Sequence, residues 1–183
     1  MCGFTAYFQF EGIVEKSISR KLAQCNTSMG YRGPDEHDIW INQNVGLAHV
    51  RLSIIGVDNG RQPMVTKDGS LALVCNGMIY NYLELKKNLE GKGYRFNTDS
   101  DSEVILYLYQ EEGISFIDKL DGMFAFCLYD LEKKVLIAGK DRMGQKPLYY
   151  SVLPKGVVFS SEAKVIKEHF ITEESINQEV LRQ

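Results

Sequence analysis

Three stretches of the chain each read as two strands joined by a short polar turn, and this recurrence limits the fold more than any other feature. They are residues 38–52 (DIWINQNVGLAHVRL), 123–141 (MFAFCLYDLEKKVLIAGKD) and 146–161 (KPLYYSVLPKGVVFSS). Strands joined by short turns pair antiparallel, whereas parallel strands need long crossover connections. The sequence therefore predicts largely antiparallel sheets.

The remaining elements fit between these hairpins. Strands are expected at residues 2–10 and 70–80, and helices at 15–29, at 81–90 and from about 101 onward. Gly91 and Gly93 should end the second helix, and Ser100 and Glu103 have the spacing of a capping box at the start of the third. Residues 54–64 are rich in turn formers and should form a loop. Many hairpins and few helices favour an α+β fold with the helices packed outside the sheets.

Length, charge and hydropathy exclude several classes of protein. A chain of 183 residues can bury one core of its own, so one main domain is expected. Lys and Arg number 21 against 24 for Asp and Glu, which leaves no basic surface for a nucleic acid partner. The longest apolar runs, such as MFAFCLY, are too short to cross a membrane, and the N-terminus lacks a signal-peptide pattern. We expect a cytoplasmic protein without a membrane or nucleic acid partner.

The four cysteines do not have the spacing of a metal site. No CxxC pair occurs among Cys2, Cys25, Cys75 and Cys127, which argues against structural zinc, and no other metal site is predicted. Cys75 and Cys127 interrupt strand-like apolar runs and Cys25 lies on a helical apolar stripe, so these three are expected to be buried core residues. Cys2 differs because it lies at the terminus.

A cysteine at position 2 can combine a nucleophile and its base in one residue. If Met1 is removed, which a small second residue generally permits, Cys2 carries both a thiol and a free α-amine. Thiols ordinarily have a pKa near 8.5 and α-amines one near 7.7 to 8.0, so an amine can relay the proton of a neighbouring thiol at neutral pH. Such a residue suits attack on an amide carbonyl.

Other residues supply what this attack needs. The strand at 70–80 runs into Asn76-Gly77, a pair that favours positive φ and whose side-chain amide and backbone N–H can converge on an oxyanion. Arg51 can hold a substrate carboxylate as a bidentate pair, and Asp101 can hold a substrate ammonium. Together these groups would recognise a free α-amino acid with an amide side chain, with glutamine as the first candidate and asparagine as the second. Taken singly, the Asn-Gly pair also suits a turn, Arg51 a surface ion pair and Asp101 an N-cap.

The order of the motifs gives a more specific interpretation. From MCGF through RGPDEHD, LAHVRLSIIG, GRQPM, NGMIYNYLEL, TDSDSEVI, LDGMFAFCLYD and GKDRMGQKPLYY to FSSEAK, the chain resembles the glutaminase domain of class II glutamine amidotransferases. Within that class it is most similar to glutamine-dependent asparagine synthetase. The resemblance implies the N-terminal-nucleophile (Ntn) hydrolase fold, a four-layer αββα sandwich of two mainly antiparallel sheets. It places the glutaminase domain at 1–170 and the start of a connection to a synthetase domain at 171–183.

The resemblance also implies roles for individual residues. Cys2 matches the nucleophile, and Asn76 with Gly77 matches the oxyanion pair. The residues implied for glutamine binding are Arg51, Leu52, Ile54, Asn76, Gly77, Met78 and Asp101. Among them Arg51 matches the carboxylate clamp and Asp101 the acid that holds the amino group. No metal or cofactor is implied for this domain.

Two departures from the family pattern matter. Relatives usually carry a glutamate after Asn-Gly that also meets the substrate ammonium, and Met78 at this position predicts weaker glutamine binding. The synthetase domain, with its SGGxDS-type pyrophosphate loop, has no counterpart in these residues, and no P-loop is found. ATP and Mg²⁺ are therefore expected only in that domain, in cis or on a partner chain, where ammonia would convert aspartate to asparagine. The resemblance also allows a homodimer.

Three alternatives stay open at this stage. Class II enzymes that make glucosamine 6-phosphate or phosphoribosylamine share the glutaminase chemistry, but they usually have histidine where this chain has Cys75. Asparagine synthetase-like enzymes with a sugar or peptide acceptor differ only in the other domain. A non-catalytic regulatory module could keep the same fold, although intact Cys2, Arg51, Asn76, Gly77 and Asp101 argue against this.

Overall fold

Nine strands form two antiparallel sheets in the computed structural model, which describes residues 1–171. The connection expected at 171–183 lies, beyond its first residue, outside the described residues. The first sheet has the order β2-β3-β1-β9-β8, with β1 (Gly3–Gln9), β2 (Glu36–Asn42), β3 (Val45–Arg51), β8 (Tyr149–Leu153) and β9 (Gly156–Ser160). The second has the order β4-β5-β6-β7, with β4 (Met64–Val65), β5 (Leu71–Ile79), β6 (Gly122–Asp130) and β7 (Val135–Lys140).

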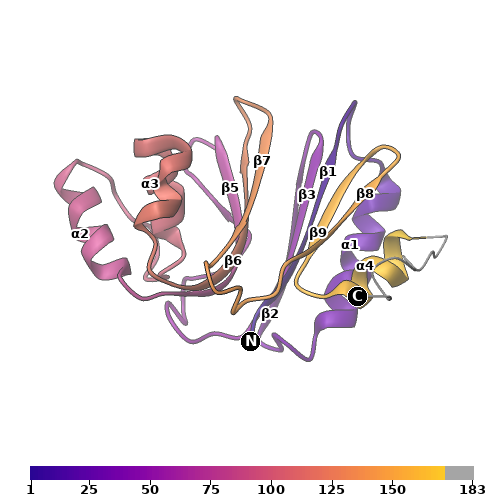
Figure 1. Cartoon of the computed structure of the whole chain (residues 1–183), viewed down its shortest axis with the longest axis horizontal. Helices are drawn as coiled ribbons and strands as arrows, with labels where there is room; N and C mark the ends of the chain where they lie inside the picture. Colours follow the sequence, from indigo (N-terminus) through magenta and orange to yellow (C-terminus); the bar gives the residue numbers. More distant parts are fainter. Residues whose placement is uncertain (172–183) are drawn as a thin grey trace, which may run out of the picture.

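Helices cover the outer face of each sheet (Figure 1). Helices α1 (Lys16–Met29) and α4 (Ala163–Phe170) pack on the five-stranded sheet. Helices α2 (Tyr82–Gly91) and α3 (Glu103–Glu112), followed by the 3₁₀ helix η1 (Gly113–Lys119), pack on the four-stranded sheet. The layers therefore run helix, sheet, sheet, helix, which confirms the predicted α+β αββα sandwich.

Alternate side chains of the central strands point into the core between the two sheets. Inward-facing side chains of β1, β3, β5 and β6 meet there, among them Phe4, Leu47, Val74, Ala125 and Tyr129, all fully buried. The residues that alternate with them on β5 and β6, such as Leu73 and Phe126, face α2 and α3 instead. Because both faces of these strands are covered, β5 and β6 are apolar at nearly every position.

Most predicted elements are confirmed to within two residues, with a few differences. Gly91 is the last residue of α2 rather than a residue beyond it, whereas Gly93 has the positive φ (97°) typical of a helix end. The two-residue strand β4 lies at the end of the expected loop, and α4 and η1 were not predicted. None of the helices within residues 1–171 has the length and apolar character that crossing a bilayer requires.

The capping box differs from its expected form. Helix α3 begins at Glu103, and the Ser100 hydroxyl accepts a hydrogen bond from the Ser102 N–H (3.3 Å). The Glu103 carboxylate reaches further back, where it accepts bonds from the Asn97 N–H (2.9 Å) and the Thr98 N–H (2.8 Å). Glu103 thus fixes the loop before the helix, and this loop carries Asp101.

Candidate active site

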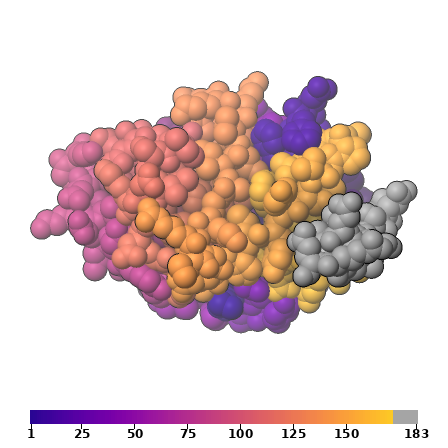
Figure 2. All heavy atoms as spheres, in the orientation of Figure 1, coloured from indigo at the N-terminus to yellow at the C-terminus, as the bar shows by residue number. Residues whose placement is uncertain are grey.

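A cavity of about 110 Å³ lies where the N-terminal residues meet the ends of β3 and β5. The N-terminus lies at the lower edge of the molecule in Figure 1, and its atoms reach the surface there in Figure 2. All eight residues predicted from the sequence line this cavity: Cys2, Arg51, Leu52, Ile54, Asn76, Gly77, Met78 and Asp101. Other lining residues include Met1, Gln62, Cys75 and Lys146. Met1 and Lys146, which are 145 positions apart in the sequence, thus meet at one place.

Cys2 lies at the start of β1, with its sulfur against the backbone of Leu52. The register of β1 and β3 pairs Gly3 with Val50, so Cys2 comes to the end of β3. Its Sγ lies 3.4 Å from the Leu52 N and 3.5 Å from the Leu52 carbonyl oxygen. The N–H can donate to a thiolate and the carbonyl can accept from a thiol, so either protonation state has a partner.

The other three thiols are fully buried. Burial raises the pKa of Cys25 to about 12 and raises those of Cys75 and Cys127 even further. A thiol with so high a pKa forms almost no thiolate near neutral pH, and thiolate is the nucleophilic form. Cys2 is the one partly exposed cysteine, so it alone is placed to react.

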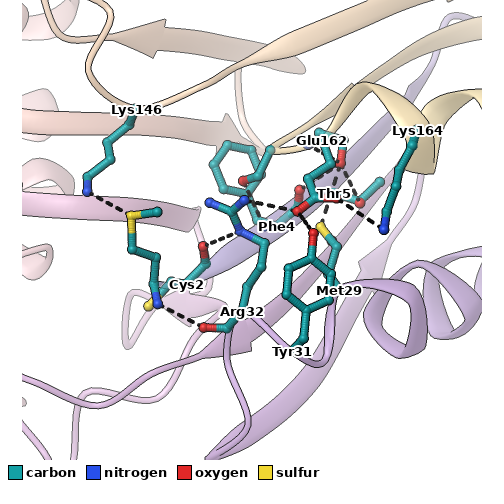
Figure 3. Close-up of polar contacts among 12 residues, drawn as sticks. Cys2, Phe4, Thr5, Met29, Tyr31, Arg32, Lys146, Glu162 and Lys164 are labelled. Carbon is teal, nitrogen blue, oxygen red and sulfur yellow. Dashed lines mark hydrogen bonds and ion pairs between the residues drawn. The ribbon is translucent and has the colours of Figure 1, made fainter.

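Arg32 holds the backbone of Cys2, a role that sequence reasoning missed. Its Nε donates to the Cys2 carbonyl (3.1 Å) and its Nη1 to the Glu162 carboxylate (2.9 Å), as Figure 3 shows. The Met1 ammonium donates to the Arg32 carbonyl (3.0 Å). Arg32 lies in the RGPD motif, but its contact is with a backbone group thirty residues away, which the motif does not reveal.

The Asn76 side chain has an unsatisfied donor. Asn76 is 2% exposed, and its Nδ2 is buried without a hydrogen-bond partner in residues 1–171. Leaving such a donor unpaired typically costs about 1 to 3 kcal/mol. Because Asn76 lines the same cavity as Cys2, an acceptor bound in the cavity could recover this energy.

Gly77 is required for a reason other than the expected one. Asn76-Gly77 lies inside the nine-residue strand β5, and Gly77 is not among the residues with positive φ. The expectation of positive φ is therefore wrong. A Cβ on Gly77 would lie 2.3 Å from the Met123 carbonyl oxygen and 2.6 Å from the Phe124 Cα, so only glycine lets β5 and β6 approach this closely at the cavity.

Asp101 lines the cavity from the loop just before α3. Its Oδ2 accepts a hydrogen bond from the Ile79 N–H (2.7 Å), which ties the loop before α3 to the end of β5. Burial raises the pKa of this carboxyl, against the opposing effect of the Ile79 bond. A cation bound nearby would favour the carboxylate form.

Arg51 is buried, and most N–H groups of its guanidinium already donate hydrogen bonds to other residues of the chain. Nη1 donates to the Glu36 carboxylate (2.8 Å) and the Val57 carbonyl (3.2 Å). Nη2 donates to the carbonyls of Gly56 (2.5 Å) and Ile55 (3.2 Å). These bonds use four of the five N–H groups. As the side chain stands, a substrate carboxylate can meet only its Nε–H, unless it displaces one of these partners.

Lys146 is a second lining residue that the sequence did not single out. It is 7% exposed, and its Nζ lies 3.4 Å from the Met1 sulfur (Figure 3). It forms no ion pair with a carboxylate within residues 1–171. Buried lysines are rare unless they are paired with a carboxylate. Here the hydrogen bond given for the Lys146 Nζ within residues 1–171 is to the Met1 sulfur, and both residues line the cavity.

Comparison with known proteins identifies relatives over most of the chain. A family model described as a glutamine amidotransferase domain matches residues 1–183. Curated relatives include asparagine synthetase [glutamine-hydrolyzing] 1 of Bacillus subtilis (strain 168), 42% identical over 165 residues. Asparagine synthetase B [glutamine-hydrolyzing] of Escherichia coli (strain K12) is 43% identical over 150 residues. The chain spans only 26% and 27% of these relatives, although the alignments cover 90% and 81% of the chain.

Among solved structures, a glutamine phosphoribosylpyrophosphate amidotransferase from B. subtilis, complexed with ADP and GMP, shares the fold. The TM-score is 0.70 at 21% sequence identity, over 91% of this chain and 43% of that chain. At this identity the likeness concerns the arrangement of sheets and helices alone.

Proposed function

The chain belongs to the family of glutamine amidotransferase domains, and on that premise we propose that it hydrolyses glutamine to glutamate and ammonia through a thioester on Cys2. The observation that carries this proposal is the buried, unpaired Nδ2 of Asn76 beside the Cys2 cavity. A buried donor that has no acceptor within the described residues is what a site for a developing oxyanion requires.

The first half-reaction forms the thioester. The Cys2 thiolate adds to the side-chain carbonyl carbon of glutamine, and the carbonyl oxygen becomes an oxyanion that Asn76 Nδ2 and the Gly77 N–H stabilise. The α-amine of Cys2, freed by removal of Met1, takes the thiol proton and passes it to the leaving nitrogen. The C–N bond then breaks and ammonia departs.

The second half-reaction regenerates the thiol. Water adds to the thioester carbonyl and the α-amine accepts one of its protons. The C–S bond then breaks, the amine returns this proton to the Cys2 sulfur, and the acid formed loses its remaining proton to solvent to give glutamate. Each step uses only groups of this chain, so we propose no metal or cofactor for this half of the chemistry. Asp101 is proposed to hold the glutamine ammonium, and Arg51, through its remaining Nε–H, the carboxylate. Leu52, Ile54 and Met78 form the adjoining walls.

We further propose that the ammonia serves a synthetase domain. The relatives named asparagine synthetases are three to four times as long as the part matched here. By this analogy the acceptor is aspartate, activated with ATP and Mg²⁺ outside this chain. Formation of asparagine from glutamine and aspartate by the protein extended beyond Gln183 would test this. A cytoplasmic location and a homodimer stay predictions.

Glutamine hydrolysis is tested by comparing protein that retains Met1 with protein from which Met1 has been removed. With Met1 attached, the Cys2 nitrogen is an amide that cannot accept a proton, and Met1 also lines the cavity. General acid-base catalysis is worth about a hundredfold to ten-thousandfold. The glutaminase rate should therefore rise in proportion to the fraction of chains lacking Met1, read by intact mass.

Two controls make this test decisive. Cys2→Ala should abolish glutamine hydrolysis in fully processed protein. A glutamine-like diazoketone should label Cys2 alone. The matched variant Cys25→Ala should keep both the hydrolysis and the labelling of Cys2. Full activity in wholly unprocessed protein would show that another group is the base. Labelling at a different cysteine, with Cys2 untouched, would reject the nucleophile.

A further inference from the structure

The Gln62 side chain continues strand pairing along one edge of β5. Gln62 is buried and lies two residues before β4. Its Oε1 accepts a hydrogen bond from the Cys75 N–H (2.6 Å), and its Nε2 donates to the Cys75 carbonyl (3.1 Å). His49 Nε2 donates to the same carbonyl (3.1 Å). Both backbone groups of the residue before Asn76 are therefore fixed by buried side chains.

The register shows that this side chain stands where a strand backbone would otherwise lie. Successive partners along the β4–β5 ladder are Thr66 with Leu71, Met64 with Leu73, and Gln62 with Cys75. Each step of two residues back along the first segment matches a step of two forward along β5. Gln62 thus keeps the ladder in register, but it bonds through its amide side chain rather than its backbone.

Gly77 is the next position on this edge. Alternate residues of a strand direct their N–H and C=O to the same side, so Cys75, Gly77 and Ile79 share an edge. The Ile79 N–H is bound by Asp101 Oδ2 (2.7 Å). Gly77 therefore lies between two anchored positions, and on this edge it has no hydrogen-bond partner in residues 1–171. The ladder stops one step short of it and leaves its N–H for a bound molecule.

We propose that Gln62 is a positioning residue for the oxyanion donors Asn76 and Gly77, an inference that rests on the proposed glutamine hydrolysis. By fixing the Cys75 carbonyl it sets the plane of the peptide bond that leads into Asn76. A displacement of about 1 Å of such groups costs about a hundredfold in rate. Because the oxyanion forms only once the thiolate adds to the carbonyl and is absent from bound glutamine, losing Gln62 lowers kcat and leaves KM nearly unchanged.

The chain offers a matched control for Gln62→Leu. Gln9 is 7% exposed against 6% for Gln62, and its Nε2 also braces backbone, donating to the carbonyls of Glu11 and Ile13 (both 2.8 Å). It lies at the opposite end of β1 from Cys2. In protein freed of Met1, Gln62→Leu should lower kcat about 10- to 100-fold with KM within about twofold, whereas Gln9→Leu leaves both unchanged despite a comparable fall in Tm.

A double-mutant cycle shows whether Gln62 acts through the donors. In an Asn76→Ala background, Gln62→Leu should lower kcat by much less than it does in the parent protein, because the donor it positions is gone. An unchanged kcat for Gln62→Leu, or full additivity, would overturn the inference while leaving the proposed function intact. Absence of glutamine hydrolysis in the processed parent protein would instead overturn the proposed function, and the inference with it.

Gln62→Glu covers the case in which Gln62→Leu does not fold. A carboxylate still accepts from the Cys75 N–H, but only the protonated acid can donate to the Cys75 carbonyl. A glutamic acid with its ordinary pKa of about 4.3 is a carboxylate at pH 8, so kcat there should be about 10- to 100-fold below that of the parent protein, with KM within about twofold. A kcat equal to that of the parent protein would overturn the inference.

Discussion

The buried histidine beside the candidate site should make the stability of the protein depend on pH. His49 is fully buried, and its Nε2 lies 3.1 Å from the Cys75 carbonyl. A carbonyl can only accept, so Nε2 carries the proton of the neutral ring, and Nδ1 is buried without a partner in residues 1–171. Burial lowers the pKa of His49 from 6.5 to about 4, against the opposing effect of the carbonyl bond.

The direction of the effect follows from which state binds the proton. Above pH 6.5 the ring is neutral in both the folded and the unfolded chain. Between pH 6.5 and about 4 the unfolded chain takes a proton that the folded protein refuses, so the free energy of unfolding falls as the pH falls. The loss is about 1.4 kcal/mol per pH unit, or about 3 kcal/mol across the whole window. Asp101, whose pKa is raised, acts in the opposite direction at the lower end, so measurements belong between pH 5 and 6.5, where His49 contributes about 2 kcal/mol.

Urea unfolding at several pH values, followed by the fluorescence of Trp40, the single tryptophan, measures this loss. His49→Gln keeps a donor for the Cys75 carbonyl but cannot titrate, so it should lack about 2 kcal/mol of the pH dependence between pH 5 and 6.5. His37 and His169 are present in both proteins and cancel. Equal slopes in the two proteins would refute the reasoning, as would an NMR titration of the His49 ring in the folded protein with a midpoint near 6.5.

Two further predictions concern glutamine binding. Asp101→Asn keeps an oxygen that can accept from the Ile79 N–H but removes the negative charge. Its kcat/KM for glutamine should therefore fall about tenfold to a hundredfold. Asp99 is exposed, and the control variant Asp99→Asn should keep a kcat/KM near the parent value. Full activity of Asp101→Asn would reject its role as the ammonium partner. Met78→Glu adds a carboxylate at the cavity wall and should lower KM with little change in kcat, because the ammonium is bound alike in the ground and transition states. A KM that is unchanged or higher would mean that the carboxylate is not needed there.

The sequence predicted the sheets well because alternation and turn chemistry are local signals. It also selected the residues that line one cavity, since their motifs could be matched one by one. Each residue that the sequence did not reveal contacts a residue distant from it in the chain. Arg32 binds the backbone of Cys2, Gln62 binds the backbone of Cys75, and Lys146 contacts the Met1 sulfur. A sequence shows which side chains can donate or accept, but the partner of each depends on the register of strands that are distant in the chain.

Asn76 and Gly77 show how register, rather than composition, makes a site. The dipeptide Asn-Gly is a strong turn signal, yet here it lies within β5, where β6 pairs with it along its whole length. The side chain and backbone of a strand residue point in different directions. The Asn76 amide and the Gly77 N–H can therefore both serve one cavity only in the observed register of β5 with its neighbouring strands. A slip of one residue would turn the Gly77 N–H toward β6 and the Asn76 side chain to the other face. Partners at positions 71 to 75 and at 79 prevent that slip, and the close approach of the Met123 carbonyl excludes any side chain at 77. The two donors therefore depend on the whole edge of β5 and not on the dipeptide alone.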